Sequence, residues 1–153
     1  MELTHKESIV VDATPAALYD LVTDIERTGE WSPVCVGCSW DEGDGPREGA
    51  WFTGRNRLGE RSWETRSVVV AAEPGREFAW QVGGSFVRWG YTFAPSAVGT
   101  EVTETWEFLP DGLAFFREKF GADGEAEIAS RAEQAHAGIP ATLAAIKRVA
   151  EAR

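Results

Sequence analysis

The feature that most constrains the fold is the stretch from Val34 to Leu109, in which runs of β-forming residues alternate with short turns. Glycine, proline and acidic residues mark these turns at 43–49, 59–60, 74–75, 83–84 and 95–99. Six strands fit between and around the turns. Because successive short turns favour hairpins, we expect an antiparallel meander.

The segment before the meander predicts one strand followed by helical structure. Residues 3–12 alternate weakly between apolar and polar, so this segment can pair with the meander as a seventh strand. Thr14 can cap a helix whose first turn contains Pro15, and the apolar spacing continues that helix to near Arg27. Residues 29–33 then predict a turn or a second short helix, because the proline that ends this segment disfavours helix at the residue before it.

The segment after the meander predicts a long amphipathic helix. Residues 110–112 start a short segment that runs to Phe120, residues 121–124 break it, and a helix follows from about Glu125 to Ala152. Its apolar stripe consists of Ile128, Ala132, Ala135, Ile139, Leu143, Ile146 and Ala150. The concave side of the meander is the one large apolar surface left for this stripe to cover.

These elements predict a single α+β domain over residues 1–153, in the order β-α-α-β6-α. A seven-stranded curved antiparallel sheet wraps around the long C-terminal helix, with two short helices after the first strand. We expect an apolar, aromatic-lined cavity between sheet and helix. A chain of 153 residues is long enough to bury one core without cross-links.

Composition narrows the class of partner. The net charge of −10 would repel nucleic acid and anionic membrane surfaces, so we expect neither as a stable partner. No apolar run has the length of a signal peptide or a membrane span, which predicts a cytoplasmic protein. We expect a monomer or a homodimer. Seven tryptophans in so small a domain indicate a roomy, partly polar interior, although an ordinary aromatic core is the alternative.

Cys35 and Cys38 form a CxxC pattern, a spacing used by redox centres and zinc sites. In a regular strand, however, residues three apart point to opposite faces, and no second CxxC or histidine pair completes a metal site. We therefore expect two reduced thiols, no bound metal and no cofactor.

Strand alternation predicts which side chains face the cavity. In the segment 51–57 the arginines on one face mark the solvent side, so Phe52 and Asn56 point inward. The same argument and the helix stripe give the full set of expected ligand contacts: Phe52, Asn56, Phe78, Trp80, Trp89, Tyr91, Trp106, Ile139 and Leu143. Asn56 can bind a ligand carbonyl or hydroxyl, or it can tie down a neighbouring strand.

Two ionisable residues are candidates for catalysis. Glu104 would share a face with Trp106, inside an aromatic wall, where it must pair with a cation, accept hydrogen bonds or take a raised pKa suited to acid–base work. We favour cation pairing, or exposure at the rim of the sheet. His136 lies beside the helix stripe and can border the cavity or stand in water at its edge. Pro140 removes the amide partner of the His136 carbonyl, which predicts a loosened turn there.

A further polar cluster is expected at the N-terminus. His5 and Glu7 share a face with the apolar side chains of their strand. If this strand flanks the last strand of the meander, both side chains reach the interior.

The sequence resembles the START-like or SRPBCC superfamily (Bet v 1-like), and specifically its polyketide cyclase/dehydrase branch. The resemblance rests on TPxxLYDLVTDIERTGEWSP from residue 14, on GTEVTETWEF from residue 99, and on the patterns FxGxNxxGxxxW at 52–63 and PGxxFAW at 74–80. It covers nearly the whole chain and implies the helix-grip fold. It leaves the chemistry open, because this superfamily includes cyclases, aromatases, lipid and hormone binders, quinone-binding proteins and chaperone activators on one scaffold.

Three functions follow as hypotheses. The first is binding of a small hydrophobic or aromatic molecule of the polyketide, lipid or quinone class. The second is a polyketide cyclase, aromatase or dehydratase that uses the same cavity, which requires at least two of Glu104, Asn56 and His136 to converge on one spot. The third is a partner-binding module of the chaperone-activator type, with a filled interior and an exposed apolar patch.

Overall fold

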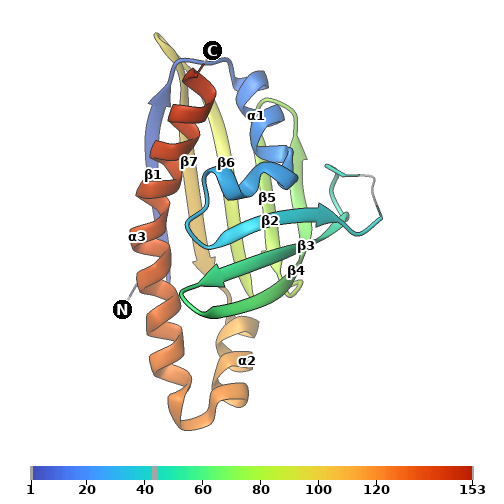
Figure 1. Cartoon of the computed structure of the whole chain (residues 1–153), viewed down its shortest axis with the longest axis vertical. Helices are drawn as coiled ribbons and strands as arrows, with labels where there is room; N and C mark the ends of the chain where they lie inside the picture. The colour runs from blue at the N-terminus through green and yellow to red at the C-terminus, as the bar shows by residue number, and fades with distance from the viewer. Residues whose placement is uncertain (1, 43–44, 153) are drawn as a thin grey trace.

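The computed structural model describes residues 2–42 and 45–152, and it contains one seven-stranded antiparallel sheet (Figure 1). The strands are β1 (Thr4–Val11), β2 (Cys35–Trp40), β3 (Trp51–Leu58), β4 (Arg61–Glu73), β5 (Glu77–Val82), β6 (Val87–Ser96) and β7 (Gly99–Phe108). Their order in the sheet is β1-β7-β6-β5-β4-β3-β2. This confirms the six-stranded meander and the pairing of the first strand with the last. Residues 43 and 44 of the expected turn at 43–49, and the chain ends at 1 and 153, lie outside the described residues.

The first helical region begins as expected and ends earlier. α1 (Pro15–Thr23) is capped by the Thr14 hydroxyl, which accepts a hydrogen bond of 3.1 Å from the Ala17 amide. The helix stops at Thr23, whose hydroxyl donates to the Tyr19 carbonyl at 2.7 Å, and it is followed by the 3₁₀ helix η1 (Ile25–Glu30). A single helix to Arg27 was therefore too long a prediction, because a threonine near a helix end competes with the backbone for carbonyl groups.

The structure contains one helix, between β7 and the long C-terminal helix, that the expected order β-α-α-β6-α does not include. The segment after β7 forms α2 (Pro110–Phe120), which η2 (Gly121–Asp123) joins to α3 (Gly124–Glu151). Pro110 occupies the first turn of α2, and Gly121 ends it with a φ of 53°, a conformation that favours glycine. The sequence pattern indicated only a short segment here because α2 lacks a side-chain cap.

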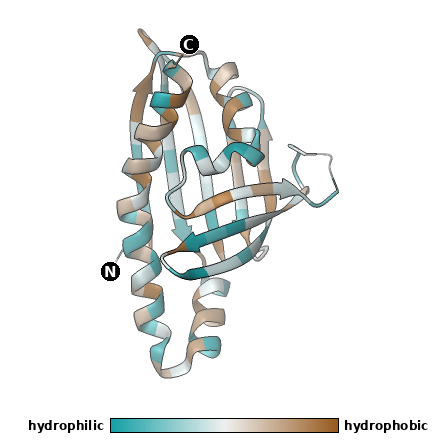
Figure 2. Cartoon of the chain, in the orientation of Figure 1, coloured by the Kyte–Doolittle hydropathy of each residue, from teal (hydrophilic) through white to brown (hydrophobic). Residues whose placement is uncertain are grey.

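α3 packs on the concave side of the sheet along β1 and β7 (Figure 1). Figure 2 shows apolar and polar bands along this helix, as expected for an amphipathic element. Its buried residues are Gly124, Ile128, Ala132, Ala135, Ile139, Thr142, Leu143, Ala145 and Ile146, which confirms the predicted stripe apart from the half-buried Ala150. α3 continues through Pro140 as one helix. Within residues 2–42 and 45–152, no helix has the length and apolar character required to cross a membrane.

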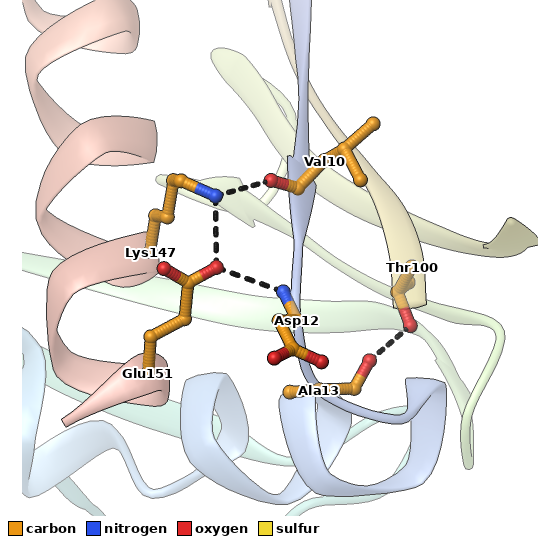
Figure 3. Close-up of polar contacts among 6 residues, drawn as sticks. All are labelled: Val10, Asp12, Ala13, Thr100, Lys147 and Glu151. Atoms are coloured by element: carbon orange, nitrogen blue, oxygen red, sulfur yellow. Dashed lines mark hydrogen bonds and ion pairs between the residues drawn. The ribbon is translucent and has the colours of Figure 1, made fainter. Parts of the chain in front are cut away.

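The C-terminal end of α3 is fastened to β1 by a small set of polar contacts, here called the clasp (Figure 3). Lys147 donates from Nζ to the Val10 carbonyl at 2.8 Å and to Glu151 Oε2 at 2.8 Å. Glu151 Oε2 in turn accepts a hydrogen bond of 2.8 Å from the Asp12 amide. The clasp therefore joins the last turns of the helix to the end of the first strand.

Candidate functional site

The concave faces of β5, β6 and β7 form an aromatic wall. Phe78, Tyr91 and Trp106 are each at most 4% exposed, whereas Trp80 and Trp89 are half-buried. Trp80 connects the wall to β3, because its ring centroid lies 5.9 Å from that of Tyr91 and 6.1 Å from that of Phe52. Strand alternation therefore predicted the inward face of the sheet correctly.

α3 closes the opposite side of this interior with aliphatic side chains. Ile139 is fully buried and Leu143 is 2% exposed. The nine side chains expected to contact a ligand are thus buried or half-buried, and their contact with a ligand stays a prediction.

Glu104 is buried in the aromatic wall at 4% exposure. Its Oε1 atom has no hydrogen-bond partner, and no cation pairs with it among residues 2–42 and 45–152. Burial raises the pKa of this carboxyl group to about 8, while the Tyr91 hydroxyl partly offsets the effect by hydrogen bonding. The expectation of cation pairing or exposure at the rim is wrong, since β7 keeps its alternation through Glu104.

Tyr91 is the direct neighbour of Glu104 across β6 and β7. Burial, and then the Glu104 charge, raise the pKa of Tyr91 well above 10, so the phenol keeps its proton. A protonated carboxyl group and a phenol together offer both hydrogen-bond donors and acceptors inside an apolar wall. The sequence placed both residues inward, but their pairing depends on strand register, which alternation alone cannot give.

The histidines lie together at one end of this interior. The His136 ring stacks on His5 with centroids 4.4 Å apart and meets the edge of Trp106 at 6.0 Å. His136 is half-buried, and its Nε2 atom is buried without a hydrogen-bond partner, so the ring lies at the edge of the interior with one nitrogen away from water. His5 Nε2 lies 2.7 Å from Glu7 Oε2, so the expected pair forms. The two side chains are 24% and 39% exposed, so the pair lies at the edge of the sheet and not deep in the interior.

Asn56 has a structural role in the sheet. Its Nδ2 atom donates to the Trp63 carbonyl at 3.4 Å and to Thr65 Oγ1 at 3.2 Å, and both partners belong to β4. Within the described part of the chain, no hydrogen bond or ring contact joins Asn56, Glu104 and His136. The convergence of at least two of these residues, which a cyclase was expected to need, is therefore not seen among these contacts, and Glu104 lies beside Tyr91 instead.

The two cysteines lie on the same face of β2, contrary to expectation. Cys35 pairs with Asn56 and Gly37 with Arg55, so β2 contains one extra residue and the ladder has a β-bulge. The bulge brings the two sulfur atoms to 3.3 Å from each other. The spacing argument was wrong because it assumed a regular strand, and the sequence carries no clear signal of the bulge.

Two hollows are defined on the outer surface. One of about 550 Å³ is lined by Glu2, Thr4, His5, Lys6, Arg88, Thr105, Trp106 and Glu107. The other, of about 560 Å³, is lined by Val10, Asp12, Ala97, Val98, Lys147 and Glu151. The first touches the interior at His5 and Trp106, whereas neither is lined by Glu104 or Tyr91. Over residues 2–42 and 45–152, no group of three histidine, cysteine or acidic side chains is arranged to hold a metal ion.

Several solved structures share this fold. The Polyketide_cyc-like protein Cgl2372 from Corynebacterium glutamicum is 52% identical over 97% of this chain and 91% of its own, with a TM-score of 0.72. The di-domain ARO/CYC protein StfQ from the steffimycin biosynthetic pathway is 17% identical, with a TM-score of 0.69 over 97% of this chain and half of its own. Ara h 8.0201 is 16% identical over 98% of both chains, with a TM-score of 0.65.

The family model agrees with this likeness, although no curated protein sequence matches the chain. The model described as "Polyketide cyclase / dehydrase and lipid transport" matches residues 3–151, which includes every strand and helix of the structure. At 16% or 17% identity the structural likeness shows only the Bet v 1-like helix-grip fold. With its sheet, its long C-terminal helix and this match, the chain belongs to the polyketide cyclase/dehydrase and lipid transport family.

Proposed function

We propose that this protein binds a small hydrophobic or aromatic molecule of the polyketide, lipid or quinone class between the sheet and α3. The observation that carries the proposal is the Oε1 atom of Glu104, which is buried without a hydrogen-bond partner beside Tyr91. A ligand with a carbonyl or hydroxyl group would give that atom a partner.

The energetics favour a ligand that is mostly apolar and carries one or two polar groups. A buried polar atom without a partner costs about 1–3 kcal/mol, so a ligand hydroxyl or carbonyl near Glu104 recovers part of that cost on binding. The surrounding rings of Phe78, Trp80 and Trp106 favour a flat or apolar body through stacking and burial. The family description, which includes both polyketide enzymes and lipid transport, supports this class of ligand.

The first experiment is a comparison of native and denaturing mass spectra of the gently purified protein. We expect an additional mass that is retained in the native spectrum and lost on unfolding. Titration of the stripped protein with a hydroxyanthraquinone, a long-chain fatty acid and a naphthoquinone, followed by tryptophan fluorescence, then identifies the class. The absence of both a co-purified mass and any binding would contradict the proposal and favour a partner-binding module.

The role of the polar pair is tested with matched variants. Glu104→Leu and Tyr91→Phe remove the donor and acceptor groups, and we expect each to weaken binding about tenfold, as for the loss of one buried hydrogen bond. Glu101→Gln changes an exposed carboxylate on the outward face of the same strand and should leave the affinity unchanged. Equal affinities for all four proteins would show that Glu104 does not contact the ligand.

A second candidate function is a cyclase or dehydratase, and the raised pKa of Glu104 favours it. A carboxyl group with a pKa of about 8 holds its proton at neutral pH and can deliver it to a departing hydroxyl group. The proton on the carbon between the ketone and that hydroxyl group leaves in the same reaction, to solvent or to the carboxylate that Glu104 has become, and a C=C bond forms. Incubation with a β-hydroxyketone chain would then release water, and the rate should fall as the pH rises through about 8. Glu104→Gln should abolish this turnover and still bind the substrate, whereas a pure binding protein would show no turnover in either form.

A further inference from the structure

The bulge in β2 creates a preformed pair of thiols. The two sulfur atoms are 3.3 Å apart, and both cysteines are free. Val36 lies between the paired residues Cys35 and Gly37 and is 57% exposed, as expected for the extra residue of a bulge. Because of this extra residue, positions three apart point to one side of the strand.

The surroundings leave space for the sulfurs to approach each other. Gly54 pairs with Cys38 across β2 and β3, and a Cβ atom on Gly54 would lie 3.6 Å from the Cys38 sulfur and 3.8 Å from the Cys35 sulfur. The missing side chain therefore leaves both sulfurs over the backbone of β3. A disulfide bond measures about 2.0 Å, so closing this gap requires only a small movement of two side chains.

The two thiols differ in accessibility and in acidity. Cys35 is half-buried, whereas Cys38 is 5% exposed. The hydrogen bond from Cys38 lowers the pKa of Cys35 to about 7, and the Arg55 charge acts in the same direction. The same hydrogen bond, together with burial, raises the pKa of Cys38. Cys35 is thus the accessible thiol that is partly ionised at neutral pH, and thiolates are the reactive form of cysteine.

We propose that Cys35 and Cys38 form a redox-active pair that hydroperoxides convert reversibly to an intrachain disulfide. A metal site is the other use of a CxxC pattern, but no third cysteine, histidine or acidic ligand joins these two within the described ranges. The short separation and the difference in accessibility favour oxidation, with Cys35 as the attacking thiol and Cys38 as the resolving thiol.

The reaction balances with one hydroperoxide per chain. The Cys35 thiolate attacks one peroxide oxygen, the O–O bond breaks, and the departing alkoxide or hydroxide takes up a proton, which leaves Cys35 as a sulfenic acid. The Cys38 sulfur then attacks the Cys35 sulfur, the S–O bond breaks, and the Cys38 proton leaves with the hydroxide as water. Two thiols are oxidised, one peroxide is reduced, and a small dithiol reverses the change by exchange.

The test uses the whole reduced chain, which contains only these two cysteines. The protein is treated with one equivalent of hydrogen peroxide under native conditions, denatured in an alkylating reagent, and weighed intact. We expect two alkyl groups before oxidation, none afterwards together with the loss of two hydrogen atoms, and two again after treatment with dithiothreitol. The same oxidation in denaturant should be at least about tenfold slower, because the bulge no longer holds the pair together.

Two single variants separate the roles of the cysteines. Cys38→Ser should stop at the sulfenic acid of Cys35, which dimedone captures as a stable adduct. Cys35→Ser should react with peroxide at least about tenfold more slowly, since Cys38 is buried and its thiol is less acidic. Equal rates for the native and denatured chains, or products limited to sulfinic acid and disulfides between chains, would overturn the proposal.

Discussion

Glu104 keeps its proton at neutral pH because its carboxyl group is buried and no cation pairs with it among residues 2–42 and 45–152. Its pKa rises from 4.5 to about 8 on burial, so the folded state binds a proton more tightly than the unfolded state does. The stabilisation from this proton is fully present below pH 4.5 and is lost as the pH rises through about 8. The chain should therefore lose on the order of a few kcal/mol of stability across this window.

Glu104→Gln should remove that pH dependence. The amide is neutral at every pH, so the variant should match the wild type at the acidic end of the window and exceed its stability at the alkaline end. Urea unfolding across the window measures the difference. Glu101→Gln, which alters an exposed residue of the same strand, should retain the wild-type slope. A wild-type curve that is flat between pH 4.5 and 8 would contradict the burial argument.

For single residues, the sequence predicted which face of the sheet a side chain points to better than it predicted which groups that side chain contacts. The inward placement of Glu104, Tyr91 and Trp106 follows from alternation, because a regular strand sends every second side chain to one face. In the described part of the chain no cation pairs with Glu104, and this could not be predicted, since it depends on where side chains from distant segments end. The prediction that Cys35 and Cys38 face opposite sides failed for a related reason. One extra residue in β2 reverses the alternation of side chains between the two cysteines.

In the helices, we expect a glycine-to-alanine substitution to have opposite effects on stability at two positions. Gly138 lies within α3, and a Cβ atom there would meet Pro33 Cγ at an ordinary 3.5 Å. Gly138→Ala should therefore stabilise the protein by about 1 kcal/mol through helix propensity. Gly112 lies in α2, where a Cβ atom would clash with the Phe86 carbonyl oxygen. Gly112→Ala should destabilise by about 1–3 kcal/mol, because backbone must move to make room.

Thermal and urea unfolding of the two alanine variants measure this contrast. Each variant is the control of the other, since both add one methyl group to a helix. Loss of stability in both would mean that the Pro33 segment cannot accommodate the added methyl group at Gly138.

Helix starts and buried faces were predicted correctly where the sequence carries a capping residue or a regular apolar spacing. The start of α1 followed from Thr14 and Pro15, and the stripe of α3 followed from its apolar spacing. The end of α1 depends on the hydrogen bond from Thr23 to the Tyr19 carbonyl. The helical character of α2 depends on its packing, which buries Gly112 against the end of β5 and β6. The first interaction is local but does not by itself set the last residue of a helix, and the second depends on Phe86, which is distant in the sequence.

At the scale of the whole molecule, the clasp fastens the last turns of α3 to the end of β1. Lys147→Met removes the bonds to Val10 and Glu151 but keeps most of the apolar stem. Because these groups are partly exposed, we expect a loss of less than about 1 kcal/mol in global stability. Local opening should increase more, so amide hydrogen exchange in the last turns of α3 should accelerate.

Arg148→Met is the matched control, since Arg148 is an exposed cation in the same turn and the clasp does not include it. Its exchange rates should stay close to those of the wild type. If both variants accelerate exchange equally, the effect comes from charge at the helix end, and the contact with Val10 contributes nothing.

The clasp also bears on which backbone groups of β1 are left open to another strand. The sheet does not close into a barrel, and β1 is one of its two outermost strands. Outermost strands offer unpaired backbone groups to any other strand that approaches, which is a common route to aggregation. Lys147 and Glu151 occupy the Val10 carbonyl and the Asp12 amide, so the end of β1 has fewer groups left for such pairing. A helix that covers the interior thereby also protects the sheet from adding a foreign strand.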